Sequence, residues 1–535
     1  MKKKILTVIL ALTAALGLMA CGAADKEADV QTAESTESTA EEGQETAEQS
    51  DDATYHVEMQ ILTWGTVPTG LEAVEQAINE VTEPEIGVTV TLNPVAAWDL
   101  ASESSMAITS GEKMDLICIL PYGSGLDSVA NYTSKNMLTP LDDLYAEYGQ
   151  DIAAHVDADV LSLGYQGGNL YAVPVNGILG VTPCFVARTD ILDELGISID
   201  EDKVYSLDEL EEMFDAYKET YGNGYYCVAA FGGMDMYNMI NRIDNLGTDD
   251  SDGVLIGAGM DGDTTVVDKF ETKEYEDFTY KMYEWYQKGF FSPDVTTITD
   301  GTTLILAQGN YFGTFGGISP GIGFETMKAG CGYDLTIIKT AESYTTSGIA
   351  SMCLWGIPVT SENPEKTMQF LNLLYQDREI GKDIDTMLSI GLEGSDYEVV
   401  EEVEGSKAIV KYPEGLDLNT VSWAFTAPIY GNQLTIPNYE PLTTDIYNEY
   451  ETYNENVLAE GNKSCVFGYV YDSSNMSTQK AAVASVISQY QPILSCGSVD
   501  PAEALPEFIQ ALKDAGIDEL VADNQAQLDA WIADR

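Results

Sequence analysis

The sequence has few basic residues and almost no histidine. It contains 25 Lys and Arg against 88 Asp and Glu, a formal net charge of −63, and 2 His. A chain this acidic repels phosphate backbones and anionic lipid surfaces, so nucleic acid is not an expected partner. His56 adjoins a polar linker, His155 fits a solvent-facing helical position, and no Gly-x-Ser-x-Gly elbow accompanies them. The sequence therefore gives no support to a Ser-His hydrolase.

Motifs for metals and phosphates are also missing. The eight cysteines show no Cys-x-x-Cys spacing, so a zinc site is not supported and no disulfide is defined. The acidic turn at 249–253 resembles part of an EF-hand, but the twelfth position of that loop is Gly259 instead of Glu. The glycine-rich run 315–323 lacks the Gly-Lys-Ser/Thr ending of a phosphate loop. We predict no metal and no cofactor.

Long apolar runs are absent apart from one near the start. Ile5–Leu18 follows three lysines and is too short to span a bilayer comfortably. Residues 18–22 read Leu-Met-Ala-Cys-Gly, which resembles the lipobox at which bacterial signal peptidase cuts before a cysteine that then carries lipid. We predict a signal peptide over residues 1–20 and lipidation of Cys21, including palmitate. The expected location is the extracytoplasmic face of the cell membrane, as in Gram-positive surface lipoproteins.

The segment after this cysteine has a biased composition. Residues 22–53 hold eleven acidic residues, one basic residue and no aromatic residue. Such a segment cannot bury enough apolar surface to fold, and its like charges extend it. We predict that residues 21–53 form a disordered, lipid-anchored spacer.

The body of the chain alternates strand-like and helical patterns. Apolar runs at 59–63, 88–92 and 116–120 are separated by amphipathic stretches at 70–81 and 100–110. This βαβαβ order predicts a parallel sheet, which receives ligands at the carboxyl ends of its strands. Trp64, Gly65 and Tyr122 directly follow strand ends and are therefore predicted at a binding edge.

Several segments, each weakly specific, occur in a characteristic order. They are Tyr171-Ala172-Val173-Pro174, a helix pattern ending in Leu195-Gly196-Ile197, Ser206–Leu210, Tyr283–Phe290 followed by Ser292-Pro293-Asp294, Leu306–Asn310, Pro358–Leu374, Pro428–Gln433 and the tail from Ala515 to Trp531. Together they resemble the family 1 extracellular solute-binding proteins, and the tail resembles that of a branch of sugar-binding lipoproteins. The resemblance covers most of the body.

The resemblance implies an α/β, two-lobe, periplasmic-binding-protein-like fold of type II. Hinge strands would join the lobes around a central ligand cleft that closes on ligand. We place lobe 1 at residues 54–183 and 311–358, and lobe 2 at 184–310 and 359–535. The implied function is that of a monomeric ABC-importer lipoprotein, not an enzyme, which captures a mono- or oligosaccharide and delivers it to membrane permease subunits.

Sugar sites combine flat aromatic rings with planar hydrogen-bonding groups. The chain contains 31 Tyr, 14 Phe and 6 Trp. The predicted ligand-binding residues are Trp64, Gly65, Tyr122, Asn176, Tyr237, Phe315, Trp355, Asn432 and Gln433. For each aromatic residue the alternative is ordinary packing, and the polar residues are equally suited to capping turns or helices.

Other functions stay open at this stage. The same fold could bind an oligopeptide or another non-sugar solute, and a binding protein that feeds a sensor would have the same sequence pattern. A surface adhesin or a degradative enzyme is the third alternative. A glycoside hydrolase would need two facing carboxylates, and no local motif selects such a pair among the 88 acids.

Overall fold

The computed structural model describes residues 54–121, 128–248, 250–423 and 429–535. The predicted signal peptide, Cys21, the spacer and Tyr122 lie outside these residues. Among the residues described, no helix combines the length and the apolar content needed to cross a membrane.

The first lobe is built on a sheet that begins with the predicted βαβαβ unit. β1 and β2 pair in parallel, and a bridge between Met59 and Leu116 places β3 on the other side of β1. β13 then pairs antiparallel with both β3 and β6. The elements of the unit are β1 (Tyr55–Thr63), α1 (Leu71–Ile86), β2 (Val88–Ala96), α2 (Leu100–Ser110) and β3 (Ile117–Ile119), joined by β6 (Ala172–Pro174) and β13 (Leu354–Gly356). The prediction of three parallel strands is confirmed, although β2 extends four residues beyond its predicted end.

Further elements of the first lobe come from two distant parts of the chain. Buried side chains of α14 and α15, such as Phe370 and Leu388, share one core with Val57 and Met59 of β1. These elements are α3 (Val129–Ser134), α4 (Asp142–Tyr148), α5 (Gln150–His155), α6 (Ala158–Leu161), β4 (Tyr165–Gln166), β5 (Asn169–Leu170), α14 (Pro364–Leu373), α15 (Ile384–Ile390), β14 (Glu398–Glu402), β15 (Ala408–Lys411) and β16 (Asn438–Tyr439).

The second lobe is built around a four-stranded sheet in the order β12-β7-β11-β8. Alternate residues of β7 face two different cores: Phe185 packs with α8 and α10, while Val186 packs with α11 and α12. The sheet is thus covered on both faces, which explains why its strands are apolar throughout. Its elements are β7 (Thr182–Arg188), α7 (Thr189–Leu195), α8 (Leu207–Tyr221), β8 (Tyr226–Val228), α9 (Met236–Ile240), β9 (Ile243–Asp244), β10 (Leu255–Ile256), α10 (Lys273–Gln287), α11 (Thr302–Leu306), β11 (Tyr311–Ile318), α12 (Ile322–Cys331) and β12 (Leu335–Lys339).

The lobe boundaries differ from those predicted. Residues 311–339, which we assigned to lobe 1, form β11 and β12 and pair with β7 in the second lobe. Much of 359–430, which we assigned to lobe 2, packs in the first core. The reason is the position of the return crossing, which follows β12 at residues 340–347 instead of preceding β11.

Three segments cross between the lobes and are hydrogen-bonded to one another. In the first pair, the amides of Val181 and Tyr344 each donate to the carbonyl oxygen of the other, both at 3.0 Å. In the second pair, Thr345 N donates to Asn462 O at 2.9 Å and Ser464 N donates to Thr345 O at 3.0 Å. The segments 175–181, 340–347 and 459–467 therefore form a narrow three-stranded hinge.

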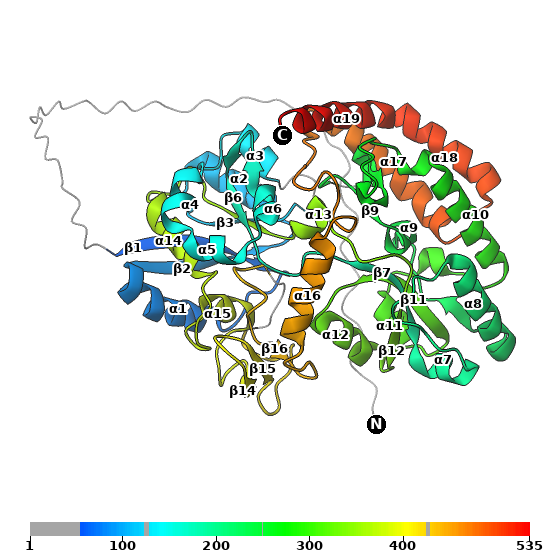
Figure 1. Cartoon of the computed structure of the whole chain (residues 1–535), viewed down its shortest axis with the longest axis horizontal. Coiled ribbons are helices and arrows are strands. Elements are labelled where there is room, and N and C mark those ends of the chain that lie inside the picture. The colour runs from blue at the N-terminus through cyan, green and yellow to red at the C-terminus, as the bar shows by residue number, and fades with distance from the viewer. Residues whose placement is uncertain (1–53, 122–127, 249, 424–428) are drawn as a thin grey trace, which may run out of the picture. The chain divides into compact units, whose positions relative to one another are not determined.

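Helices from the C-terminal part complete the hinge and the second lobe. Asn454 of α16 (Ile446–Leu458) accepts from Leu179 N at 2.9 Å and donates to Gly177 O at 2.8 Å, so α16 lies along the first crossing. α17 (Ser477–Ser495), α18 (Pro501–Ala515) and α19 (Ile517–Ala533) contribute Val483, Phe508 and Leu520 to the second core. Figure 1 shows α17 and α18 close to α10. α13 (Ser347–Ala350) connects the second crossing to β13.

Candidate functional site

Two exposed tryptophans stand at the carboxyl ends of β1 and β2. The strands end in register, with Thr63 opposite Ala96, and Ala97 N donates to Thr63 O at 2.9 Å. Trp64 follows β1 and is 57% exposed, and Trp98 follows β2 and is 67% exposed. Contiguous exposed apolar patches often mark binding sites, which makes two exposed indoles at neighbouring strand ends a candidate site.

Gly65 brings the two loops into contact. Its φ of +86° is a backbone conformation that L side chains rarely adopt, and a Cβ atom there would lie 3.0 Å from Cη2 of Trp98. The glycine therefore permits the loop after β1 to pass directly against the indole of Trp98. We call the surface formed by Trp64, Gly65 and Trp98 the tryptophan edge.

The buried carboxylate of Asp396 holds the segment that ends at residue 423 near the start of α1. Asp396 accepts hydrogen bonds from Ser422 Oγ at 2.6 Å and from Trp423 N at 2.9 Å. Ser422 O in turn accepts from Gly70 N at 2.9 Å, immediately before α1. The segment before residue 424 is thus fixed against the start of α1, which follows the tryptophan edge in sequence.

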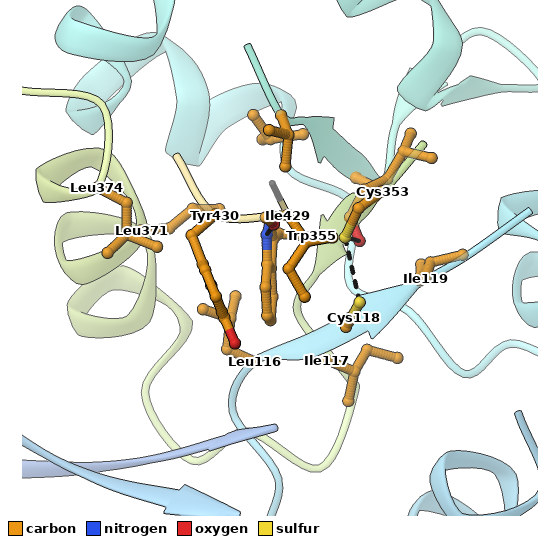
Figure 2. Close-up of a cluster of buried hydrophobic side chains, with 14 of the residues drawn as sticks. Leu116, Ile117, Cys118, Ile119, Cys353, Trp355, Leu371, Leu374, Ile429 and Tyr430 are labelled. Atoms are coloured by element: carbon orange, nitrogen blue, oxygen red, sulfur yellow. Dashed lines mark hydrogen bonds between the residues drawn. The ribbon is translucent and has the colours of Figure 1, made fainter. Parts of the chain in front are cut away.

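Trp355, predicted as a stacking platform, lies in the interior of the first lobe. It is 0% exposed, its Nε1 donates to Ile429 O at 2.7 Å, and its ring stacks on Tyr430 with 5.7 Å between centroids. Figure 2 shows the two rings side by side above β3. Trp355 therefore offers no surface to a ligand.

Tyr237 and Phe315 are also core residues here. Tyr237 makes edge contacts with Tyr275 and Phe278, both at 5.2 Å between centroids. Phe315 stacks on Trp285 at 6.1 Å with an interplanar angle of 9°. Both rings belong to the second core, and their surroundings account for them without a ligand.

The structure brings Asn176, Asn432 and Gln433 together, but their side chains bond to other protein groups. Asn176 Nδ2 donates to Asn432 Oδ1 at 2.8 Å. Gln433 Nε2 donates to Asp385 Oδ1 at 2.6 Å and to Ser389 Oγ at 3.0 Å. All three residues are buried, and burial also raises the pKa of Asp385 well above its ordinary value. This network joins the start of the first crossing to the first lobe.

The second lobe presents its own strand-end edge after β8. Lys269 Nζ, which is fully buried, donates to Asp235 Oδ2 at 2.8 Å and to Asn238 Oδ1 at 2.9 Å, and so fixes the start of α9. Arg242, just after α9, donates from Nη2 to Gly461 O at 2.6 Å and connects this edge to the third crossing.

Comparisons with known proteins agree with this architecture. A family model described as a domain of unknown function (DUF3502) matches residues 465–533, which include α17–α19. The chain is 24% identical over 474 residues to a carbohydrate ABC transporter substrate-binding protein of Streptococcus pneumoniae serotype 4, covering 88% of this chain and 90% of the relative. The crystal structure of the N-glycan transport solute binding protein NgtS from S. pneumoniae matches with a TM-score of 0.73 and 22% identity, covering 90% of this chain and 99% of that one. The chain has the fold of an extracellular solute-binding protein.

Two structures solved as complexes also match this solute-binding fold. The S. pneumoniae ABC-transporter substrate binding protein FusA in complex with kestose matches with a TM-score of 0.57 and 14% identity over 90% of this chain and all of that one. NgtS in complex with Man5GlcNAc matches with a TM-score of 0.62 and 22% identity, over 90% of this chain and 99% of that one.

Trp98 belongs to the tryptophan edge but was not among the ligand-binding residues predicted from the sequence. The same strand-end rule that selected Trp64 would have selected it, but the predicted strand stopped at residue 92, four residues before β2 ends. Pro94 is accommodated because β2 is an edge strand that pairs only with β1 among the strands described.

Proposed function

We propose that this chain is the substrate-binding component of an ABC importer and captures a carbohydrate, either a mono- or an oligosaccharide. The tryptophan edge is the observation that carries the proposal. It places two exposed indoles at the carboxyl ends of parallel strands, where open α/β sheets receive their ligands. The names of the relatives, which include proteins of N-glycan and other carbohydrate transport, support a sugar over a peptide.

Indole rings suit the apolar face of a sugar ring. The C–H groups of a pyranose present a flat apolar surface, while its hydroxyl groups point outward around the ring. Trp64 and Trp98 expose apolar area from two neighbouring loops, so they could contact successive residues of one oligosaccharide. Burying this area against the ligand would supply a driving force that is independent of the pattern of hydroxyl groups.

The three-stranded hinge supports capture by closure. The three crossings bond to one another by backbone groups, so small dihedral changes along them would rotate the lobes as rigid bodies. A ligand that touches both lobes would stabilise the closed form, and the permease subunits would recognise that form.

The predicted lipidation of Cys21 places this capture outside the cell membrane. The acidic spacer would hold a monomeric binding body away from the envelope. The protein would bind its substrate without a chemical step, and the names of its relatives, which describe substrate or solute binding, support this.

Isothermal titration of residues 54–535 with oligosaccharides tests the proposal. We expect saturable binding of one carbohydrate class with one ligand per chain and no product on incubation. Peptides of similar size serve as the comparison series. Binding of peptides with no response to any carbohydrate would refute the sugar assignment, and turnover of the ligand would refute the transport role.

A further inference from the structure

Two buried cysteines of the first lobe lie in contact. Cys118 is in β3 and Cys353 directly precedes β13, and their Sγ atoms are 3.1 Å apart. Both side chains are within the first core. Figure 2 shows the two sulfur atoms facing one another between the strands.

The strand register explains why they meet. β3 and β13 are antiparallel, with Cys118 opposite Trp355 and Ile119 opposite Leu354. Residues two apart on a strand face the same side, so Cys353 lies on the same face as Trp355. Because Cys118 is the residue opposite Trp355, Cys118 and Cys353 lie on the same face of the sheet. A disulfide has its sulfur atoms about 2.05 Å apart, so a movement of about 1 Å by the two side chains would suffice to form the bond.

We propose that Cys118 and Cys353 form a disulfide in the secreted protein. The inference takes from the proposed function only the extracytoplasmic location, where disulfides form and persist. Sequence spacing gave no sign of this pair because 235 positions separate the two residues.

The oxidant would be a disulfide of the surroundings, either a low-molecular-weight disulfide or that of a thiol oxidase. One cysteine thiolate attacks that disulfide, forms a mixed disulfide and releases one thiolate of the reagent. The thiolate of the second cysteine then attacks the sulfur of the first cysteine in this mixed disulfide and releases the second thiolate of the reagent. The two protein sulfurs lose two electrons, the reagent gains them, and the two protons end on the released thiols.

This bond would join parts of the first lobe that lie on either side of the second lobe in sequence. β3 leads to the strand-end edge at Leu120, next to β1, and β13 is the first strand after the second crossing. The cross-link would therefore keep the sheet beneath the tryptophan edge intact while the hinge moves. Because both cysteines are buried, we expect the bond to form as the sheet assembles and then to resist reductants.

Peptide mapping of the purified protein tests the proposal directly. The protein is unfolded and refolded with a mixture of oxidised and reduced glutathione, alkylated in denaturant, and digested without reduction. We expect one cross-linked peptide pair that contains Cys118 and Cys353, and two fewer alkylated thiols than in a reduced sample. Full alkylation of both cysteines, or a bond to a different cysteine, would overturn the proposal.

Melting temperatures give a second readout. We expect the oxidised protein to melt at a higher temperature than the reduced protein, and this difference to vanish in Cys118→Ala and in Cys353→Ala. Cys227→Ala, which removes a buried thiol from the second lobe, is the matched control and should keep the difference. Carbohydrate titration of the same samples separates the two proposals, since the bond can form in a protein that binds no sugar and sugar can bind without the bond.

Discussion

Replacement of Trp98 by alanine tests the tryptophan edge most directly. A tryptophan side chain presents up to about 250 Å², so the 67% that is exposed amounts to about 165 Å². A sugar ring covers one face, or roughly half of this area. At about 25 cal/mol per Å², the lost contact is worth about 2 kcal/mol, or roughly a 30-fold rise in Kd.

The assay is isothermal titration with the tightest carbohydrate found for the wild type. The folded state should lose little stability, because an exposed ring contributes little to the core. Tyr280→Ala is a matched control, since this aromatic is 45% exposed on α10 in the second lobe, away from the edge. Trp64→Ala should weaken binding in the same direction.

A Kd for Trp98→Ala within threefold of the wild type would refute the reasoning. So would an equal loss in Tyr280→Ala, because that would show a general effect of removing surface aromatics. A loss of binding accompanied by a fall in melting temperature of many degrees would refute the assignment of Trp98 as a surface residue.

Three further predictions follow from buried or strained positions. Gly65→Ala should weaken carbohydrate binding by titration, since the new Cβ displaces the ring of Trp98; unchanged affinity would contradict the contact. Burial raises the pKa of Asp383 from 3.8 to about 6, so its charging destabilises the fold as the pH rises through this range. Asp383→Asn should therefore stabilise the protein above pH 6 by roughly 2–3 kcal/mol in urea titrations, with the gain lost below pH 4; a gain independent of pH would refute this origin. Lys269→Met should cost about 2–4 kcal/mol in urea unfolding, because it leaves the carboxylate of Asp235 without its buried partner, and a neutral result would contradict the pairing.

Local patterns predicted the parallel unit of the first lobe because its strands and helices follow one another directly. The same patterns could not separate Trp64 from Trp355, since each precedes a glycine at the end of an apolar run. Only the fold distinguishes them. β13 is the middle strand between β3 and β6, and Tyr430, far along the chain, covers the ring of Trp355.

The polar candidates show the same limit. Asn176 and Asn432 were predicted as ligand-binding residues, and their contact with each other depends on a bridge between their backbones across 256 positions. The lobe boundaries were misplaced for a related reason: β11 and β12 pair with β7, and nothing in their own residues identifies the lobe of the partner strand.

The interleaving of the lobes has a consequence for the order of assembly. β13 occupies the centre of a sheet whose other strands come from the first third of the chain, and the second core requires α17–α19 near the C-terminus. As the chain emerges from its N-terminal end, the first sheet stays incomplete until residue 356 is available, and the second core forms later still. Folding of this chain is therefore dominated by long-range contacts, and its apolar strands stay exposed until distant segments become available.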